Sequence, residues 1–218
     1  MNWINTIQLG DCMEYLKSMP DKCVDLLLTD PPYGIGEANG KNKSRGILAP
    51  ARDYGKKDWD ATAPRKEYFD EMRRVSKNQI IWGGNYFAEY LTNSPCWIAW
   101  NKLNGATDFA DCELAWTSFK SAVRLFEYQW HGMLQGERKY KEERFHPTQK
   151  PLPLFLWLLE KYSEPGALIL DPFSGSGTTA IAAHRLGRRF ICIEKDAEYH
   201  AASLKRLKKE QEQLLLPL

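Results

Sequence analysis

The chain has 218 residues, and its 30 lysines and arginines against 28 aspartates and glutamates give a formal net charge of +2. This length suits one α/β domain with a sizeable core. A total charge so near zero cannot by itself argue for nucleic-acid binding, so any basic surface would have to be local. We expect no signal peptide and no membrane span, because no apolar run is long enough. The five scattered cysteines form no C-x-x-C pair and favour a reduced, cytoplasmic protein.

In chain order, the hydrophobic pattern alternates between short strands and helices. Strands are predicted over 6–9, 24–29, 79–82, 96–100, 113–119, 124–130, 167–170 and 190–193. Helices are predicted over 13–19, 64–75, 152–162, 180–186 and 197–216. We expect the strands over 113–119 and 124–130 to pair in antiparallel fashion. The alternation is typical of an α/β fold.

The stretch Asp30-Pro31-Pro32-Tyr33 follows the predicted strand over 24–29. Proline has no N–H and a φ fixed near about −65°, so the strand must stop at Asp30. Ligands of open α/β sheets bind at the carboxyl ends of strands, where this carboxylate and aromatic ring would lie. For this motif alone, a simple turn in which Asp30 caps and Tyr33 packs remains an alternative.

A second strand end is rich in glycine. The predicted strand over 167–170 runs into Asp171-Pro172-Phe173-Ser174-Gly175-Ser176-Gly177-Thr178-Thr179, and a helix follows. Gly175 and Gly177 would let the backbone approach a ligand, and the helix N-terminus offers free N–H groups. Glu194, at the end of the next strand, is placed to bind a ribose diol. Taken alone, the unit predicts a nucleotide-type ligand such as NAD, with a ligand-free tight turn as the alternative.

Two segments lack regular periodicity. Residues 34–63 are basic and rich in glycine, and residues 132–144 are polar and strongly charged. A long basic loop beside a candidate site could clamp a phosphate backbone, although a solvated surface loop has the same composition. The segment 132–144 has the same two interpretations. His146 follows it, and because no partner at a suitable spacing makes it a metal ligand, we predict no metal.

Taken together, the motifs resemble one family. D-P-P-Y at 30–33, H-P-T-Q-K-P at 146–151, D-P-F-S-G-S-G-T-T at 171–179 and Glu194 look like the DNA amino-methyltransferases, in the class whose catalytic motif precedes the S-adenosylmethionine motif. W-G-G-N-Y-F at 82–87 and C-W-I-A-W-N-K at 96–102 extend the resemblance over almost the whole chain.

The resemblance implies a Rossmann-like, S-adenosylmethionine-dependent methyltransferase fold with permuted motif order. It implies a single catalytic domain over 1–218 and a mostly parallel, seven-stranded-type sheet with helices on both faces. The strands ending at Asp30 and Asp171 would lie side by side. The segment 118–145 would be the target-recognition insertion, and its shortness argues against strict sequence specificity by one subunit.

The resemblance also implies roles for residues. The catalytic residues would be Asp30, Pro31, Pro32 and Tyr33, with Asp30 and the Pro31 carbonyl hydrogen-bonded to the target amine and Tyr33 stacked on an extruded base. The methyl donor would be bound by Asp11, Asp30, His146, Thr148, Lys150, Asp171, Phe173, Gly175, Gly177, Thr178 and Glu194.

We therefore expect a site-specific DNA methyltransferase that flips adenine out of double-stranded DNA and methylates its N6 amine with S-adenosylmethionine. Cytosine-N4 methylation is the near alternative. An NAD-dependent oxidoreductase is a more distant one, which leaves D-P-P-Y unexplained, and a catalytically silent DNA-binding module is a third. A homodimer and a partner restriction endonuclease, as in a restriction-modification system, are compatible with the resemblance, and the residues select neither.

Overall fold

The computed structural model describes residues 2–35, 62–105, 110–131, 134–136, 142–144, 146 and 148–214. Ten strands are found among them: β1 (Thr6–Leu9), β2 (Val24–Thr29), β3 (Ser76–Trp82), β4 (Trp97–Asn101), β5 (Cys112–Thr117), β6 (Arg124–Glu127), β7 (Trp130–His131), β8 (Leu134–Gln135), β9 (Leu168–Asp171) and β10 (Arg189–Glu194). Eight of them form one sheet in the order β1-β10-β9-β2-β3-β5-β4-β6, while β7 and β8 form a separate hairpin.

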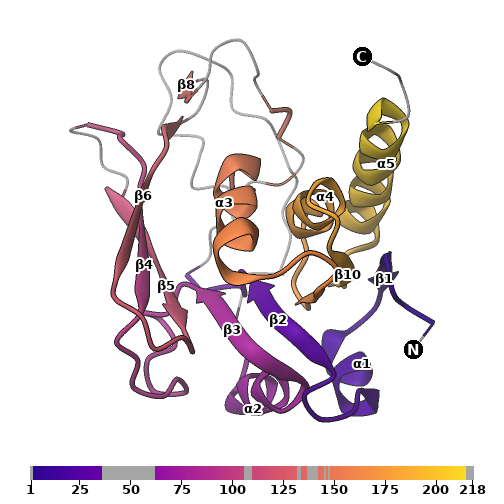
Figure 1. The fold of residues 1–218 in the computed structure, drawn as a ribbon, viewed down its shortest axis with the longest axis horizontal. Helices are drawn as coiled ribbons and strands as arrows, with labels where there is room; N and C mark the ends of the chain where they lie inside the picture. The colour runs from indigo at the N-terminus through magenta and orange to yellow at the C-terminus, as the bar shows by residue number, and fades with distance from the viewer. Residues whose placement is uncertain are drawn as a thin grey trace.

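Helices cover both faces of the sheet (Figure 1). They are α1 (Cys12–Ser18), α2 (Lys66–Val75), α3 (Leu152–Tyr162), α4 (Thr178–Arg185) and α5 (Ala197–Leu214). Two hydrophobic cores result, because successive side chains of a strand point to opposite faces. In β2, Leu27 joins the core that contains α1 and α2, whereas Leu26 and Leu28 join the core that contains α3 and α4.

The pairing of β2 with β9 brings the two predicted strand ends together. These strands are parallel, with Leu26 opposite Ile169 and Leu27 opposite Leu170. Asp30 and Asp171 therefore lie close together at the carboxyl ends of two neighbouring central strands, as the resemblance implied. The α/β class, the mostly parallel sheet and the helices on both faces are confirmed. The sheet has eight strands and not seven, with β1 at one edge beside β10 and β6 at the other edge beside β4.

The expected antiparallel pairing of 113–119 with 124–130 is wrong. β5 instead lies between β3 and β4 and is antiparallel to both, and β6 pairs in parallel with β4. Burial explains the difference. Ala115 and Trp116 of β5 are almost fully buried and suit an inner strand, whereas Leu125 of β6 is 60% exposed and suits an edge.

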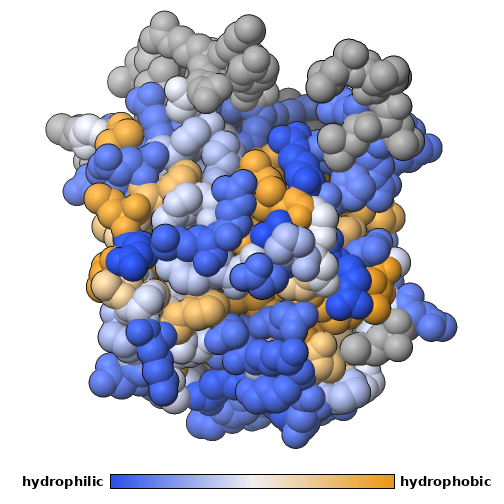
Figure 2. All heavy atoms as spheres, viewed as in Figure 1, coloured by the Kyte–Doolittle hydropathy of each residue, from blue (hydrophilic) through white to orange (hydrophobic). Residues whose placement is uncertain are grey.

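Hydrophilic side chains gather at the bottom of the view in Figure 2, where Figure 1 places α2 and α1. On α2, the solvent-accessible side chains of Lys66 and Asp70 form an ion pair with each other. Within the ranges that the structure describes, no helix is both long and apolar enough to cross a membrane.

Candidate functional site

Asp171 joins the two central strand ends to the helix that follows. Its carboxylate accepts hydrogen bonds from the Thr29 hydroxyl (2.8 Å), the Thr179 hydroxyl (2.5 Å) and the Phe173 N–H (3.2 Å). Burial raises the pKa of Asp171 to about 6, although these hydrogen bonds oppose the shift. Both carboxylate oxygens thus bind the protein itself. This geometry gives Asp171 a part in shaping the site, and its predicted contact with the methyl donor stays a prediction.

The glycine-rich turn follows Asp171 and leads into α4. Gly175 and Gly177 have φ values of 49° and 76°, in the left-handed region that glycine adopts without strain. Glu194 borders the turn from the end of β10 and accepts hydrogen bonds from the N–H groups of Gly175 (2.7 Å) and Asp196 (2.8 Å). Burial raises the pKa of Glu194, and the two backbone N–H groups oppose this shift. The turn and its carboxylate are therefore held in one geometry.

The turn also contains a polar group that a ligand could satisfy. The Ser174 hydroxyl is buried and has no hydrogen-bond partner among the described residues. Buried polar groups are nearly always hydrogen-bonded, so an orphaned one beside a glycine turn is typical of a site for a polar ligand. The glycines, the hydroxyl and Glu194 together fit a bound nucleoside.

Asp11 and Phe173 flank this end of β10. The N–H of Gly10 donates to the Glu194 backbone carbonyl at 2.9 Å. The Asp11 carboxylate caps α1 through the Met13 N–H (3.0 Å) and pairs with Lys195 (3.2 Å). Burial would raise the pKa of Asp11, but the Met13 N–H and Lys195 outweigh it and lower the pKa.

The ring of Phe173 lies near that of Tyr68, which was not among the predicted site residues. The Tyr68 and Phe173 ring centroids are 6.2 Å apart, and the Tyr68 hydroxyl lies 3.4 Å from Asp11. Tyr68 comes from α2, far from any of the motifs, so only the fold brings it to the site.

His146 packs against the glycine-rich turn. Its Cδ2 lies 3.7 Å from the position that a Cβ on Gly175 would occupy. The ring meets Tyr199 of α5 edge-on at 4.2 Å, and its Nδ1 is 3.0 Å from the Thr148 hydroxyl. The structure thus brings His146 and Thr148 to the predicted donor site.

Lys150 reaches the other strand end and contacts Asp30. Its ammonium pairs with Asp30 Oδ2, and Asp30 Oδ1 accepts a hydrogen bond from the Tyr33 hydroxyl at 2.7 Å. Burial raises the pKa of Asp30, with Lys150 opposing the shift. Burial would lower the pKa of Lys150, but Asp30 and Glu113 outweigh it and raise the pKa. Lys150 therefore stays protonated. Pro31, the residue that follows Asp30, is buried.

Glu113 and Lys102 extend this ion pair, and neither was among the predicted site residues. Lys150 Nζ lies 3.1 Å from one Glu113 oxygen, and Lys102 Nζ lies 2.5 Å from the other. Asp30, Lys150, Glu113 and Lys102 thus alternate in sign, and we call these four residues the charge cluster. Burial would raise the pKa of Glu113, but the two lysines outweigh it and hold the pKa at about 2. In the sequence, Lys102 follows one predicted strand and Glu113 begins the next, but their contact could not be predicted because the pairing of these strands was unknown.

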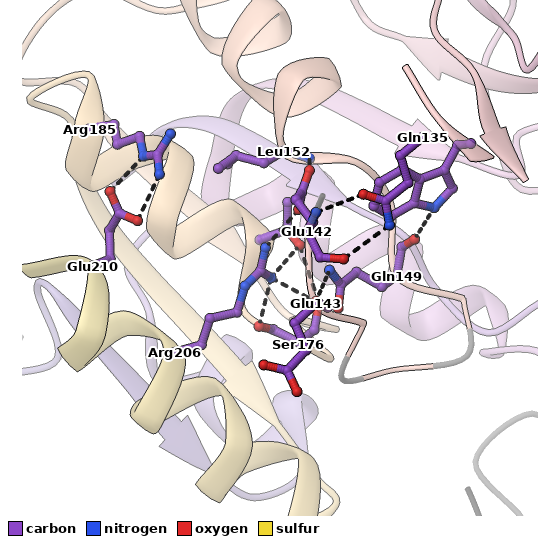
Figure 3. A network of polar contacts seen from close by, with 11 residues as sticks. Gln135, Glu142, Glu143, Gln149, Leu152, Ser176, Arg185, Arg206 and Glu210 are labelled. Carbon is purple, nitrogen blue, oxygen red and sulfur yellow. Dashed lines mark hydrogen bonds and ion pairs between the residues drawn. The ribbon is translucent and has the colours of Figure 1, made fainter. Parts of the chain in front are cut away.

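A network of polar contacts ties the segment before α3 to the glycine-rich turn (Figure 3). Arg206 of α5 donates to the Thr178 hydroxyl (2.9 Å) and the Ser176 carbonyl (3.1 Å), and it pairs with Glu142 at 3.1 Å. The other Glu142 oxygen accepts a hydrogen bond from the N–H of Leu152, the first residue of α3 (2.8 Å). The Thr178 hydroxyl, predicted to serve the donor, is therefore engaged by Arg206.

Most of the basic segment 34–63 and part of the segment 118–145 lie outside the described residues. For the basic segment 34–63 this applies to 36–61, and for 118–145 it applies to 132–133, 137–141 and 145. Where the second segment is described, its charges contact the protein itself: Glu142 pairs with Arg206, and the Arg144 guanidinium lies 4.6 Å from the Trp130 ring centroid.

Known proteins resemble this chain in both sequence and fold. A model of the N6/N4 methyltransferase family, described as DNA methylase, matches residues 97–205. The type II methyltransferase M.HinfI of Haemophilus influenzae is 30% identical over 95% of this chain and 69% of its own length. The M1.HpyAVI–SAM complex superposes with a TM-score of 0.59 at 24% identity, over 92% of this chain and 98% of its own. PvuII DNA methyltransferase, titled cytosine-N4-specific, superposes with a TM-score of 0.57 at 17% identity, over 96% and 92%.

Proposed function

The chain belongs to the N6/N4 DNA methyltransferase family, and from this premise we propose that it methylates the N6 amine of adenine in double-stranded DNA with S-adenosylmethionine as the donor. One observation carries the proposal. The parallel pairing of β2 with β9 brings Asp30-Pro31-Pro32-Tyr33 beside the glycine-rich turn after Asp171. A base-binding motif and a nucleoside-binding turn at one sheet edge are what a transfer between the two ligands requires.

The donor would be held by the turn and the residues around it. Gly175 and Gly177 allow close approach of the backbone, Glu194 would accept hydrogen bonds from the ribose diol, and Ser174 supplies a free hydroxyl. When bound, S-adenosylmethionine supplies an electrophilic methyl group on a sulfonium. The M1.HpyAVI structure, which contains that donor, supports the assignment. An NAD-dependent oxidoreductase would use the same turn, but it gives no role to Asp30 and Tyr33.

Asp30 would activate the target amine. The lone pair of an exocyclic amine is delocalised into the ring, so the amine is a poor nucleophile. Hydrogen bonds to the Asp30 carboxylate and the Pro31 carbonyl would localise that lone pair, and catalysis would then come from positioning and electrostatics. Asp30 must exchange contacts with Lys150 or the Tyr33 hydroxyl to do so. It is also placed to accept the proton that the amine loses once methylated, and burial raises its pKa as that task requires.

Tyr33 would stabilise the target base outside the helix. A base within the duplex is out of reach, and flipping it costs a few kcal/mol. Stacking on an aromatic ring is worth about 1–3 kcal/mol per base and would offset much of this cost. A purine presents the larger face, which favours adenine. In the family that the chain resembles, aspartate at the position of Asp30 is the usual residue of adenine enzymes, whereas cytosine enzymes more often have serine.

The test is mass spectrometry of nucleosides from unmethylated DNA incubated with purified protein and methyl-labelled donor. We expect label in N6-methyladenine. Label only in N4-methylcytosine would overturn the base assignment, and label in neither base would overturn the activity. Asp30→Ala is the matched inactive variant: it should lose turnover and stay folded by circular dichroism, because Glu113 still pairs with the Lys150 ammonium. Normal turnover by Asp30→Ala would refute the mechanism.

A further inference from the structure

Tyr33 is held in place from several directions. Its hydroxyl donates to Asp30 at 2.7 Å and lies 3.3 Å from Lys150 Nζ. Its ring packs against Gly83, where an added Cβ would fall only 2.2 Å from the Tyr33 Cε1, and Phe87 meets it edge-on at 6.0 Å. Gly83 and Phe87 are both buried. This side of the Tyr33 ring therefore belongs to the interior of the protein.

The side that leads to the surface is covered by Tyr86. The Tyr33 and Tyr86 rings are stacked, with centroids 4.8 Å apart and an interplanar angle of 17°. Tyr86 follows β3 in a short turn, in which its N–H donates to the Gly83 carbonyl at 2.8 Å. It is 50% exposed, and its hydroxyl forms no hydrogen bond with any described residue. Tyr86 thus occupies the place where a base would stack on Tyr33.

A stacked base and the present position of Tyr86 exclude each other. Bases in duplex DNA are spaced by about 3.4 Å, so a base between two rings needs them about 7 Å apart. The two rings are already stacked in contact, with their centroids 4.8 Å apart, so the gap between their planes has to open by about 3.4 Å and one ring has to move. Among the described residues, Tyr33 is restrained by two polar contacts and by its packing against Gly83 and Phe87, whereas Tyr86 is held by its own turn and this stack. Tyr86 is therefore the ring that moves.

We propose that Tyr86 is a second base-binding residue, which covers Tyr33 in the free protein and moves outward by about 3.4 Å so that the extruded base binds between the two rings. This inference deepens the proposed function and rests on it. While no base is bound, the stack keeps an aromatic face out of water. When the base enters, contact between two rings is replaced by two contacts between a ring and a base, so little favourable stacking is lost.

The test compares Tyr86→Phe, Tyr86→Leu and Tyr86→Ala on a duplex that carries the methylated sequence, as mapped with the wild-type protein. Phenylalanine keeps the flat ring, leucine keeps apolar cover without it, and alanine keeps neither. If Tyr86 stacks on the base, kcat/KM for DNA should fall by about 5- to 150-fold in the alanine variant, stay within about twofold in the phenylalanine variant and fall for leucine nearly as far as for alanine. Donor affinity by calorimetry should not change in any of them.

A second readout reports the base directly. With 2-aminopurine at the target position, a base held between two rings is quenched, so the alanine variant should fluoresce more brightly than the wild type and the phenylalanine variant should match it. Equal kinetics and equal fluorescence for all three variants would overturn the inference while wild-type methylation stands. Rescue by leucine as complete as by phenylalanine would also overturn it, because Tyr86 would then be only an apolar cover. Absence of methylation by the wild type would instead refute the proposed function.

Discussion

Replacing Glu113 by glutamine tests how much the charge cluster stabilises the fold. The substitution keeps the shape of the side chain and removes the negative charge between Lys150 and Lys102. The pKa of Glu113 is about 2 in the folded protein against an ordinary value of 4.5. At 1.36 kcal/mol per pKa unit this amounts to about 3 kcal/mol at neutral pH, as an upper estimate. Glutamine keeps part of the hydrogen bonding, so we expect Glu113→Gln to lose about 1–3 kcal/mol at pH 7.

The sign of the pH dependence follows from the lowered pKa. A carboxyl group with a depressed folded-state pKa contributes its full stability above its unfolded value and loses it as pH falls toward the folded value. The difference between Glu113→Gln and wild type should therefore be largest near pH 7 and roughly halved by about pH 3. The measurement is the free energy of unfolding from urea titrations at both pH values.

The control is Glu127→Gln. Glu127 belongs to β6 and accepts a hydrogen bond from Asn101 on the surface (3.0 Å), so its replacement should change the unfolding free energy by less than about 0.5 kcal/mol. Equal stabilities of Glu113→Gln and wild type at pH 7 would refute the reasoning. So would a difference that stays constant between the two pH values, because it could not come from the ionisation of Glu113.

Three further outcomes are expected. Asp171 has a raised pKa of about 6, so its stabilising effect is present at low pH and lost as pH rises through that value. Asp171→Asn should therefore raise the unfolding temperature relative to wild type at pH 8 and not at pH 4. Calorimetry should show that the donor affinity of Asp171→Asn is within a few-fold of wild type. Glu194→Ala should weaken S-adenosylmethionine binding at least about tenfold by calorimetry, and NAD should bind to neither protein. Arg206→Met would leave the largely buried Glu142 without its cation and should cost about 3–5 kcal/mol in urea unfolding, part of which the double variant with Glu142→Gln should recover.

Local patterns predicted most elements of the fold. The helix over 152–162 and the strands over 6–9 and 24–29 were predicted with the bounds that the structure gives to α3, β1 and β2. Most other bounds differ by one or two residues, because capping and fraying decide where an element ends. The prediction that β2 and β9 lie side by side came from the family resemblance. About 140 residues separate these strands, and hydrophobic periodicity carries no information on such long-range pairing.

The wrong strand pairing and two of the missed residues both depend on the order of the strands in the sheet. Neighbours in sequence often pair, which favoured a hairpin of β5 and β6, but the chain inserts β4 between them. The same order brings Lys102, the residue after β4, together with Glu113 on β5, and Glu113 in turn contacts Lys150. Tyr86 was missed for another reason: its motif was read only as part of the resemblance, and its stacking on Tyr33 depends on the turn that Gly83 begins.

The segment that carries His146 and Lys150 connects the two halves of the site. His146 lies against Gly175 of the donor turn, and four residues further on Lys150 is paired with the carboxylate that would hold the target amine. Glu142 fixes the approach to this segment, through Arg206 to the donor turn and through its hydrogen bond with Leu152 to the start of α3. A ligand that shifts the donor turn would therefore also shift Lys150, and with it the charge facing Asp30. Because such coupling is reciprocal, donor binding and base binding should change each other's affinity by the same factor.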